Sequence, residues 1–180
     1  MKKFLFVVLA VMLLTFSAAF AQETETVNEI NWTDVEPAVA EAGISGDFAA
    51  VSDLGIMMWI PDVFSEIELD EEDVEDGFIC ILATEDEEEG VMVFYEDFEG
   101  AGLEDLLAVL SEEEDVEEPE MGVINGIPAL TYTDVENDAL NVVFMTDEGY
   151  AVVFSFFPMS DEGFSQVAAI MAASIQAVEE

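Results

Sequence analysis

Residues 122–157 read GVINGIPALTYTDVENDALNVVFMTDEGYAVVFSFF, and this stretch decides the fold. It consists of apolar runs that are rich in β-branched and aromatic residues and separated by short polar groups, a pattern typical of consecutive strands. Asn125-Gly126 separates the first two runs and is a strong signal for a two-residue hairpin. Asp147-Glu148-Gly149 joins the last two long runs in the same way. Consecutive hairpins predict an antiparallel meander.

Similar runs precede this stretch and bring the expected number of strands to about six or more. They are DFAAVS (47–52), IMMWIP (56–61), FICILAT (78–84) and VMVFYED (91–97). FICIL and YAVVFSFF are apolar on both faces of the pleat, which is unusual for an antiparallel sheet with one face in water. We therefore expect further layers to cover both faces of the sheet.

Three segments have helical spacing instead. WTDVEPAVAEAG (32–43) begins with a possible capping box, Thr33 with Glu36; Pro37 falls in the expected first turn and Gly43 at the end. GLEDLLAVLSEEED (102–115) and SDEGFSQVAAIMAASIQAVEE (160–180) each have one apolar face, and Ser160 or Asp161 caps the last helix. The two apolar faces comprise Leu103, Leu106, Leu107 and Leu110 in the first, and Phe164, Val167, Ala168, Met171, Ile175 and Val178 in the second. The expected fold class is α+β, an antiparallel sheet sandwiched between helices in an α/β/α arrangement.

The N-terminal residues 1–21, MKKFLFVVLAVMLLTFSAAFA, have the layout of a secretory signal peptide, with cleavage expected between Ala21 and Gln22. Position 22 is not cysteine, so we do not expect a lipoprotein. The expected product is a soluble protein outside the cytoplasm. Residues 22–45 are expected to form a polar leader and a short helix, and residues 46–180 a single domain.

Charge restricts the possible partners more than any motif does. The chain has 43 acidic residues and no histidine, and its only two basic residues, Lys2 and Lys3, lie in the signal peptide. Its formal charge therefore changes from −41 to −43 when the signal is removed. Nucleic acids and anionic membranes are excluded as partners because both are bound through basic side chains. Cations and cationic proteins are favoured, and 52% hydrophobic residues make a packed core feasible.

The same composition removes most catalytic chemistry. Cys80 has no second cysteine to pair with, and no Lys, Arg or His is available to activate it, so we expect a buried, inert thiol. Serine and cysteine nucleophiles paired with histidine are also excluded. Paired carboxylates leave a glycan hydrolase as a low-ranked alternative. Trp32 and Trp59 are aromatic side chains that could stack on sugars, although Trp59 in IMMWIP is expected in the core.

The order of these segments resembles the PsbP-like superfamily. The similarity rests on MMWIPDVF, the Leu-rich helix, GVINGIPALTYT, the paired strands of LNVVFMTDEGYAVVFSFFP and the last amphipathic helix, and it covers roughly residues 46–178. The superfamily has an α/β/α sandwich around an antiparallel sheet and includes photosystem II extrinsic proteins, a eukaryotic Ran-binding import factor and small bacterial exported proteins. The resemblance implies a non-enzymatic module that binds or supports other proteins, without catalytic residues or a cofactor.

One acidic segment partly matches a calcium-binding loop. If Gly90 is aligned with the central glycine of such a loop, Glu85, Glu87 and Glu89 fall at the first three ligand positions and Glu96 at the twelfth. Strands rather than helices flank the segment, so a solvated hairpin turn is the favoured interpretation. Diffuse association of Ca²⁺ or Mg²⁺ with the whole surface is expected in either case.

From the sequence we therefore expect an exported, highly acidic, non-catalytic interaction or support module. A low-affinity calcium-binding or divalent-cation-binding protein is the first alternative. A carboxylate-dependent glycan hydrolase is the second.

Overall fold

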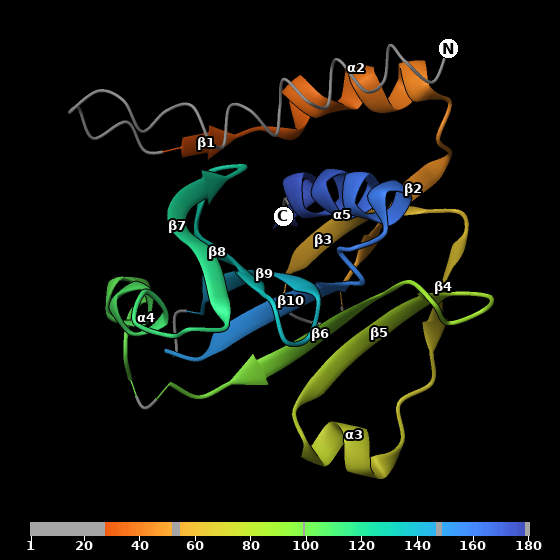
Figure 1. Ribbon diagram of the computed structural model, residues 1–180. Helices are drawn as coiled ribbons and strands as arrows, with labels where there is room; N and C mark the ends of the chain where they lie inside the picture. The colour runs from red at the N-terminus through yellow and green to blue at the C-terminus, as the bar shows by residue number, and fades with distance from the viewer. Residues whose placement is uncertain (1–27, 52–54, 99, 147–148, 179–180) are drawn as a thin grey trace.

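The computed structural model describes residues 28–51, 55–98, 100–146 and 149–178, so the predicted signal peptide and its cleavage position at Ala21 and Gln22 lie outside the described residues. Within these ranges the chain forms four helices and two sheets (Figure 1). The predicted α+β class is confirmed. In the same ranges, none of the helices is long and apolar enough to cross a membrane.

The main sheet has eight strands in the order β1-β7-β8-β9-β10-β6-β5-β4. In that order the strands are β1 (Asn28–Ile30), β7 (Val116–Ile124), β8 (Ile127–Asp134), β9 (Ala139–Met145), β10 (Ala151–Phe157), β6 (Gly90–Glu96), β5 (Phe78–Thr84) and β4 (Phe64–Ile67). Strands β7 to β10 are consecutive antiparallel neighbours, as the meander prediction required. The β9–β10 pairing is confirmed as well, although residues 147 and 148 of its predicted turn lie outside the described residues.

The sheet differs from the prediction at its first strand, because β1 pairs with β7 in the parallel direction and makes the sheet mixed. The physical reason is the path of the chain. Strand β1 leads within one residue into helix α2 (Trp32–Ala42), which packs against helix α5 (Glu162–Ser174). The backbone N–H of Asn125 donates a hydrogen bond to the backbone carbonyl of Ile30. This bond fixes the connection between β1 and α2.

A second correction concerns the predicted strands DFAAVS and IMMWIP, which do not join the meander. They form β2 (Gly46–Ala50) and β3 (Ile56–Pro61) of a separate three-stranded sheet, completed by β11 (Gln176–Ala177). Both faces of β3 are buried, with Met58 in the central core and Trp59 against α2. The small sheet therefore forms a layer that covers the central core. The sequence of a single strand does not show which sheet that strand joins.

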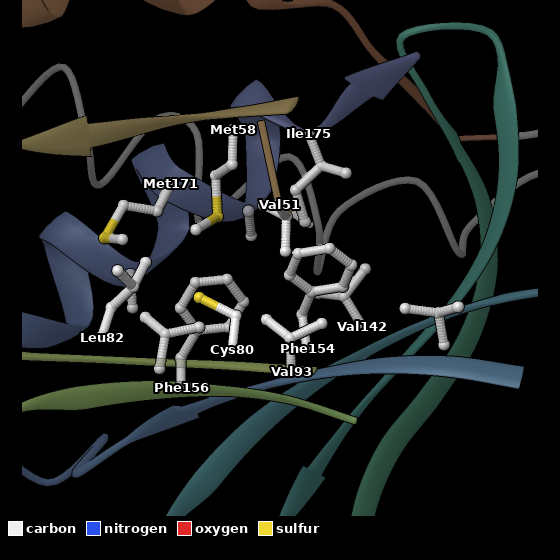
Figure 2. Close-up of a cluster of buried hydrophobic side chains, with 14 of the residues drawn as sticks. Val51, Met58, Cys80, Leu82, Val93, Val142, Phe154, Phe156, Met171 and Ile175 are labelled. Carbon is white, nitrogen blue, oxygen red and sulfur yellow. The ribbon is translucent and has the colours of Figure 1, made fainter. Parts of the chain in front are cut away.

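Three buried clusters show how the layers stack. The largest lies between the main sheet and the layer formed by α5 and the small sheet; in Figure 2, Phe154 and Phe156 from β10 meet Met58 and Met171 there. The second lies under helix α4 (Leu103–Leu110) on the opposite side of the main sheet. The third joins α2 to α5 and Trp59. The stacking confirms the expected sandwich and adds α2 as an outer layer.

The Asn125-Gly126 hairpin was predicted, but the role of its side chain was not. Both residues have positive φ, 47° and 82°, as a turn between Ile124 and Ile127 requires. The Asn125 amide nitrogen donates to the carbonyls of Ala173 and Ile175 at 2.9 and 2.8 Å. Its Oδ1 accepts from the Trp32 backbone at 2.6 Å. One side chain therefore connects the hairpin, the start of α2 and the end of α5.

This contact corrects the predicted start of α2. The N-cap is Asn31, without a side-chain cap, and the Thr33–Glu36 capping box does not form. A tertiary partner, Asn125, takes one of the free N–H groups at the helix start. Pro37 consequently lies inside the helix rather than in its first turn.

The last helix is shorter than predicted. Asp161 caps α5 as expected, but the helix ends at Ser174 and the backbone of Ile175 is extended. Gln176 and Ala177 then pair with β3, so Val178 lies outside the helix and is 42% exposed. Pairing with the small sheet replaces the final helical turns.

Besides β1 and β11, two further elements have no counterpart in the sequence prediction. Strand β4 pairs with β5 at the sheet edge, and α3 (Glu71–Glu75) is a single acidic turn. Asp70 and Asp73 form a capping box at its start. Both elements lie in an acidic segment with few apolar residues, so no apolar periodicity marks them in the sequence.

Candidate interaction surface

The predicted calcium-loop residues lie in and beyond the turn between β5 and β6. Thr84 organises this turn: its hydroxyl donates to the Asp86 carboxylate at 2.7 Å, and its carbonyl accepts from the Glu87 amide at 2.9 Å. The hydrogen bond from Thr84 lowers the pKa of Asp86. Glu85 and Glu87 are exposed within the turn, and Glu89 is partly buried where it ends.

Glu96 is not brought to this turn. It lies at the C-terminal end of β6, where it pairs with Ala151. Six residues separate it from Gly90 along the strand, which corresponds to about 20 Å at the usual rise per residue. In the part of the chain that the structure describes, no three acidic, cysteine or histidine side chains gather closely enough to hold a metal ion. Glu85, Glu87 and Glu89 therefore share one turn without forming a metal site, and Glu96 lies apart from them.

Two carboxylates have a raised pKa. Burial is the main cause for Glu89, and the negative charges of Asp161, Asp86 and Glu88 add to it. Burial alone raises the pKa of Glu96. Part of the Glu96 side chain is still exposed to solvent. Both carboxylates hold a proton more readily in the folded protein than in the unfolded chain.

Neither tryptophan nor the cysteine forms an open site. Trp59 is 6% exposed, as its expected core position required, and it stacks on Trp32 at a ring distance of 5.9 Å. Cys80 is buried, and burial together with the charge of Glu66 raises the pKa of its thiol to about 11. At neutral pH the thiol is therefore protonated and unreactive.

The side of the main sheet that carries α4 is only partly covered. Helix α4 lies over β7, β8 and β9 and leaves the region of β5 and β6 without a helix across it (Figure 1). In this uncovered region Ile81 pairs with Met92, and both side chains are partly exposed and lie outside the three buried clusters of the described chain. Phe78 contacts Phe94 at the border with the α4 cluster, at a ring distance of 5.8 Å. This arrangement corrects the expectation that both faces of FICIL are covered.

Phe157 completes the apolar part of this region. It pairs with Gly90, and its ring lies over the space that a side chain at position 90 would fill: a Cβ there would come within 2.8 Å of Phe157 Cζ. The open face, as we name it, therefore has Phe78, Ile81, Met92 and Phe157 as its apolar side chains.

Polar side chains extend the open face from β6 across the neighbouring strands β10, β9 and β8. Tyr132 pairs with Asn141, Asn141 with Ser155, and Ser155 with Met92, so all four side chains project to one side. Asn141 and Ser155 are only 4% and 6% exposed. Among the described residues, no fully buried side-chain nitrogen or oxygen lacks a hydrogen-bond partner, so any polar atom of Asn141 or Ser155 that is not paired reaches solvent. These polar groups lie beside the apolar side chains of the open face.

Negative charge borders this row. Burial is the main cause that raises the pKa of Tyr132 to about 12, and the charges of Glu96 and Asp134 add to it. The open face thus combines apolar side chains, three polar side chains and an acidic border. The sequence reasoning missed it because strand order and the reach of α4 decide which residues share the face. The apolar runs of β5 and β6 were the only local signal.

The chain was compared with protein families, curated proteins and solved structures. No family model and no curated protein matches it. Among solved structures, it is similar to cyanobacterial PsbP (CyanoP) from Synechocystis, with a TM-score of 0.51 and 14% sequence identity. The match covers 74% of this chain and 93% of the cyanobacterial one. The chain therefore has the PsbP-like fold that its order of strands and helices suggested.

Proposed function

We propose that the protein is an exported, non-catalytic interaction or support module whose partners are basic proteins. The observation that carries this proposal is the charge: 43 acidic residues stand against no basic residue beyond Lys3. Such a surface attracts cationic partners over about one Debye length, near 8 Å at physiological salt. Similarity to the PsbP-like fold supports a binding role over a catalytic one.

Affinity capture from the native extracytoplasmic fraction tests this proposal. We expect a saturable complex of defined stoichiometry with a basic protein, weakened as salt rises. Size-exclusion chromatography with mass determination measures the stoichiometry. Failure to find any stoichiometric complex, or capture that is independent of the partner's charge, would contradict the proposal.

Divalent-cation binding is the second candidate, favoured by the 43 acidic residues of the chain and not by any cluster of ligands in the described residues. Calorimetric titration with Ca²⁺ separates two forms of it. Saturable binding at micromolar Ca²⁺ indicates a dedicated site, whereas weak heat without saturation indicates screening. The matched variant is the triple Gln substitution of Glu85, Glu87 and Glu89, compared with a triple substitution of Glu71, Glu72 and Glu75 in α3.

The hydrolase alternative has less support. A glycosidase needs two carboxylates about 5–10 Å apart in a cleft that holds a sugar. The cavity between β1, β7 and β8 has a volume of about 10 Å³, which is at the lower limit for holding one water molecule. Release of reducing sugar from mixed glycans would revive this alternative.

A further inference from the structure

The open face has the composition of a protein-binding surface. Its apolar side chains, Ile81 and Met92 among them, lie in one layer of a pleated sheet and do not surround a cavity. Small ligands are usually bound in concave pockets, whereas flatter surfaces with an apolar centre and polar groups suit protein partners. Asn141, Ser155 and Tyr132 add hydrogen-bond donors and acceptors to the same face of the sheet.

Charge complementarity selects the kind of partner. Glu96 and Asp134 lie close enough to Tyr132 to act on its hydroxyl, and the acidic turn at residues 85–88 lies at the other end of β6. A second copy of this chain would bring an equally negative surface, which opposes self-association through this face. A basic partner gains attraction at the border and apolar contact at the centre.

We propose that the open face docks a basic protein partner whose lysine and arginine side chains surround an apolar centre. This inference rests on the proposed function and adds the place and the chemistry of the contact. The partner's apolar side chains lie on Ile81, Met92 and Phe157. Its polar groups reach Asn141 and Ser155, and its cationic side chains lie near Glu96 and Asp134.

Two synthetic peptides of equal charge test this inference. One carries six lysines around a Trp-Leu-Phe centre, and the other has serine in place of the three apolar residues. We expect the first to bind the mature protein about tenfold more tightly at physiological salt, a ratio equivalent to 1.4 kcal/mol. Isothermal titration calorimetry measures both affinities.

Methyl signals locate the peptide without any substitution. In a sample labelled at methionine methyl groups, we expect the signal of Met92 to shift on addition of the first peptide. Met58 and Met171 are fully buried on the other side of the main sheet and serve as internal controls (Figure 2). Shifts at all three methionines, or at none, would contradict docking at this face.

Matched variants complete the test. Ile81→Gln and Met92→Gln should abolish the tenfold preference, whereas Val178→Gln, at an exposed apolar position beside the small sheet, should preserve it. If both peptides bind with equal affinity and no variant changes that affinity, binding is due to diffuse charge. The docking inference then fails, and the proposed function stands. If neither peptide binds, the proposed function fails too. Dimerisation that Met92→Gln disrupts would assign the face to a second copy and overturn the inference.

Discussion

At the scale of single residues, Asn125 shows how one side chain can hold several elements together. Its turn conformation is a local property, because Asn followed by Gly readily adopts positive φ. Its three side-chain hydrogen bonds, to Trp32, Ala173 and Ile175, join parts of the chain that lie 48 to 93 residues away. Asn125 therefore has a second role that only the folded chain reveals.

Asn125→Ala should lower the free energy of unfolding by about 2–4 kcal/mol. The substitution leaves a backbone N–H and two carbonyls without their partner and places alanine at positive φ. Chemical denaturation measures the loss. Asn125→Gly is the matched control, because glycine tolerates the φ angle and removes only the hydrogen bonds. Equal stability of the glycine variant and the wild type would show that these bonds contribute nothing.

Glu96 makes a prediction about pH. Because burial raises its pKa in the folded state, the folded protein binds more protons than the unfolded chain, and stability falls as pH rises. The fall begins near the unfolded glutamate value, about 4.3, and ends above the raised folded value. Glu96→Gln should stabilise the protein at pH 7 and flatten this part of the curve. Urea midpoints from pH 4 to 7 measure the effect.

The control for this experiment is Glu68→Gln, which removes the same charge from an exposed position. Each variant removes one negative charge, so the difference between them reports the desolvation that raises the pKa of Glu96. A larger stabilisation by Glu68→Gln would contradict the assigned cause.

At the scale of elements, α2 depends on a cluster of its own. Val35 and Val39 pack with Trp59, Ile170 and Ala173, apart from the large core under α5. The helix ends in a left-handed Gly43 cap and contains Pro37, so its own hydrogen bonding is interrupted. Most of its stability must come from this packing.

Replacing Val35 and Val39 together by alanine should release α2 before the main sheet unfolds. Loss of two buried valines costs on the order of 3 kcal/mol, and that loss is confined to the third cluster. Amide hydrogen exchange should accelerate in residues 32–42 and stay slow in β9 and β10. Equal acceleration in the main sheet would show that the two parts unfold as one unit.

At the scale of the whole molecule, like charge opposes folding. The acidic side chains of the described residues are drawn closer together in the folded state, and the sequence beyond Lys3 supplies no basic side chain to pair with them. The hydrophobic clusters on both sides of the main sheet outweigh this repulsion. Cations in solution can reduce this repulsion between carboxylates by screening it.

The melting temperature should therefore rise with ionic strength, and more efficiently with millimolar Ca²⁺ or Mg²⁺ than with Na⁺. Screening shortens the reach of each charge from about 30 Å at 0.01 M salt to about 3 Å at 1 M. Differential scanning calorimetry between these limits measures the effect. A melting temperature that does not change with salt would refute it.

The sequence by itself determined the class of the fold, the strands β7 to β10 with their Asn125-Gly126 turn, and the helices around Leu106 and Phe164. These features follow from periodicity and turn chemistry over a few residues, which act locally. It also determined the charge of the chain, 43 acidic residues against two basic ones.

Only the tertiary structure decided that β2 and β3 leave the meander, that β1 pairs in parallel and that Glu96 lies far from the turn at Glu85. It also decided that α4 stops short of Ile81 and Met92 and so leaves the open face uncovered. Each of these features depends on contacts between segments that are far apart in the sequence. Many different strand pairings are compatible with the same local pattern of apolar and polar residues. Packing over the whole chain selects among them.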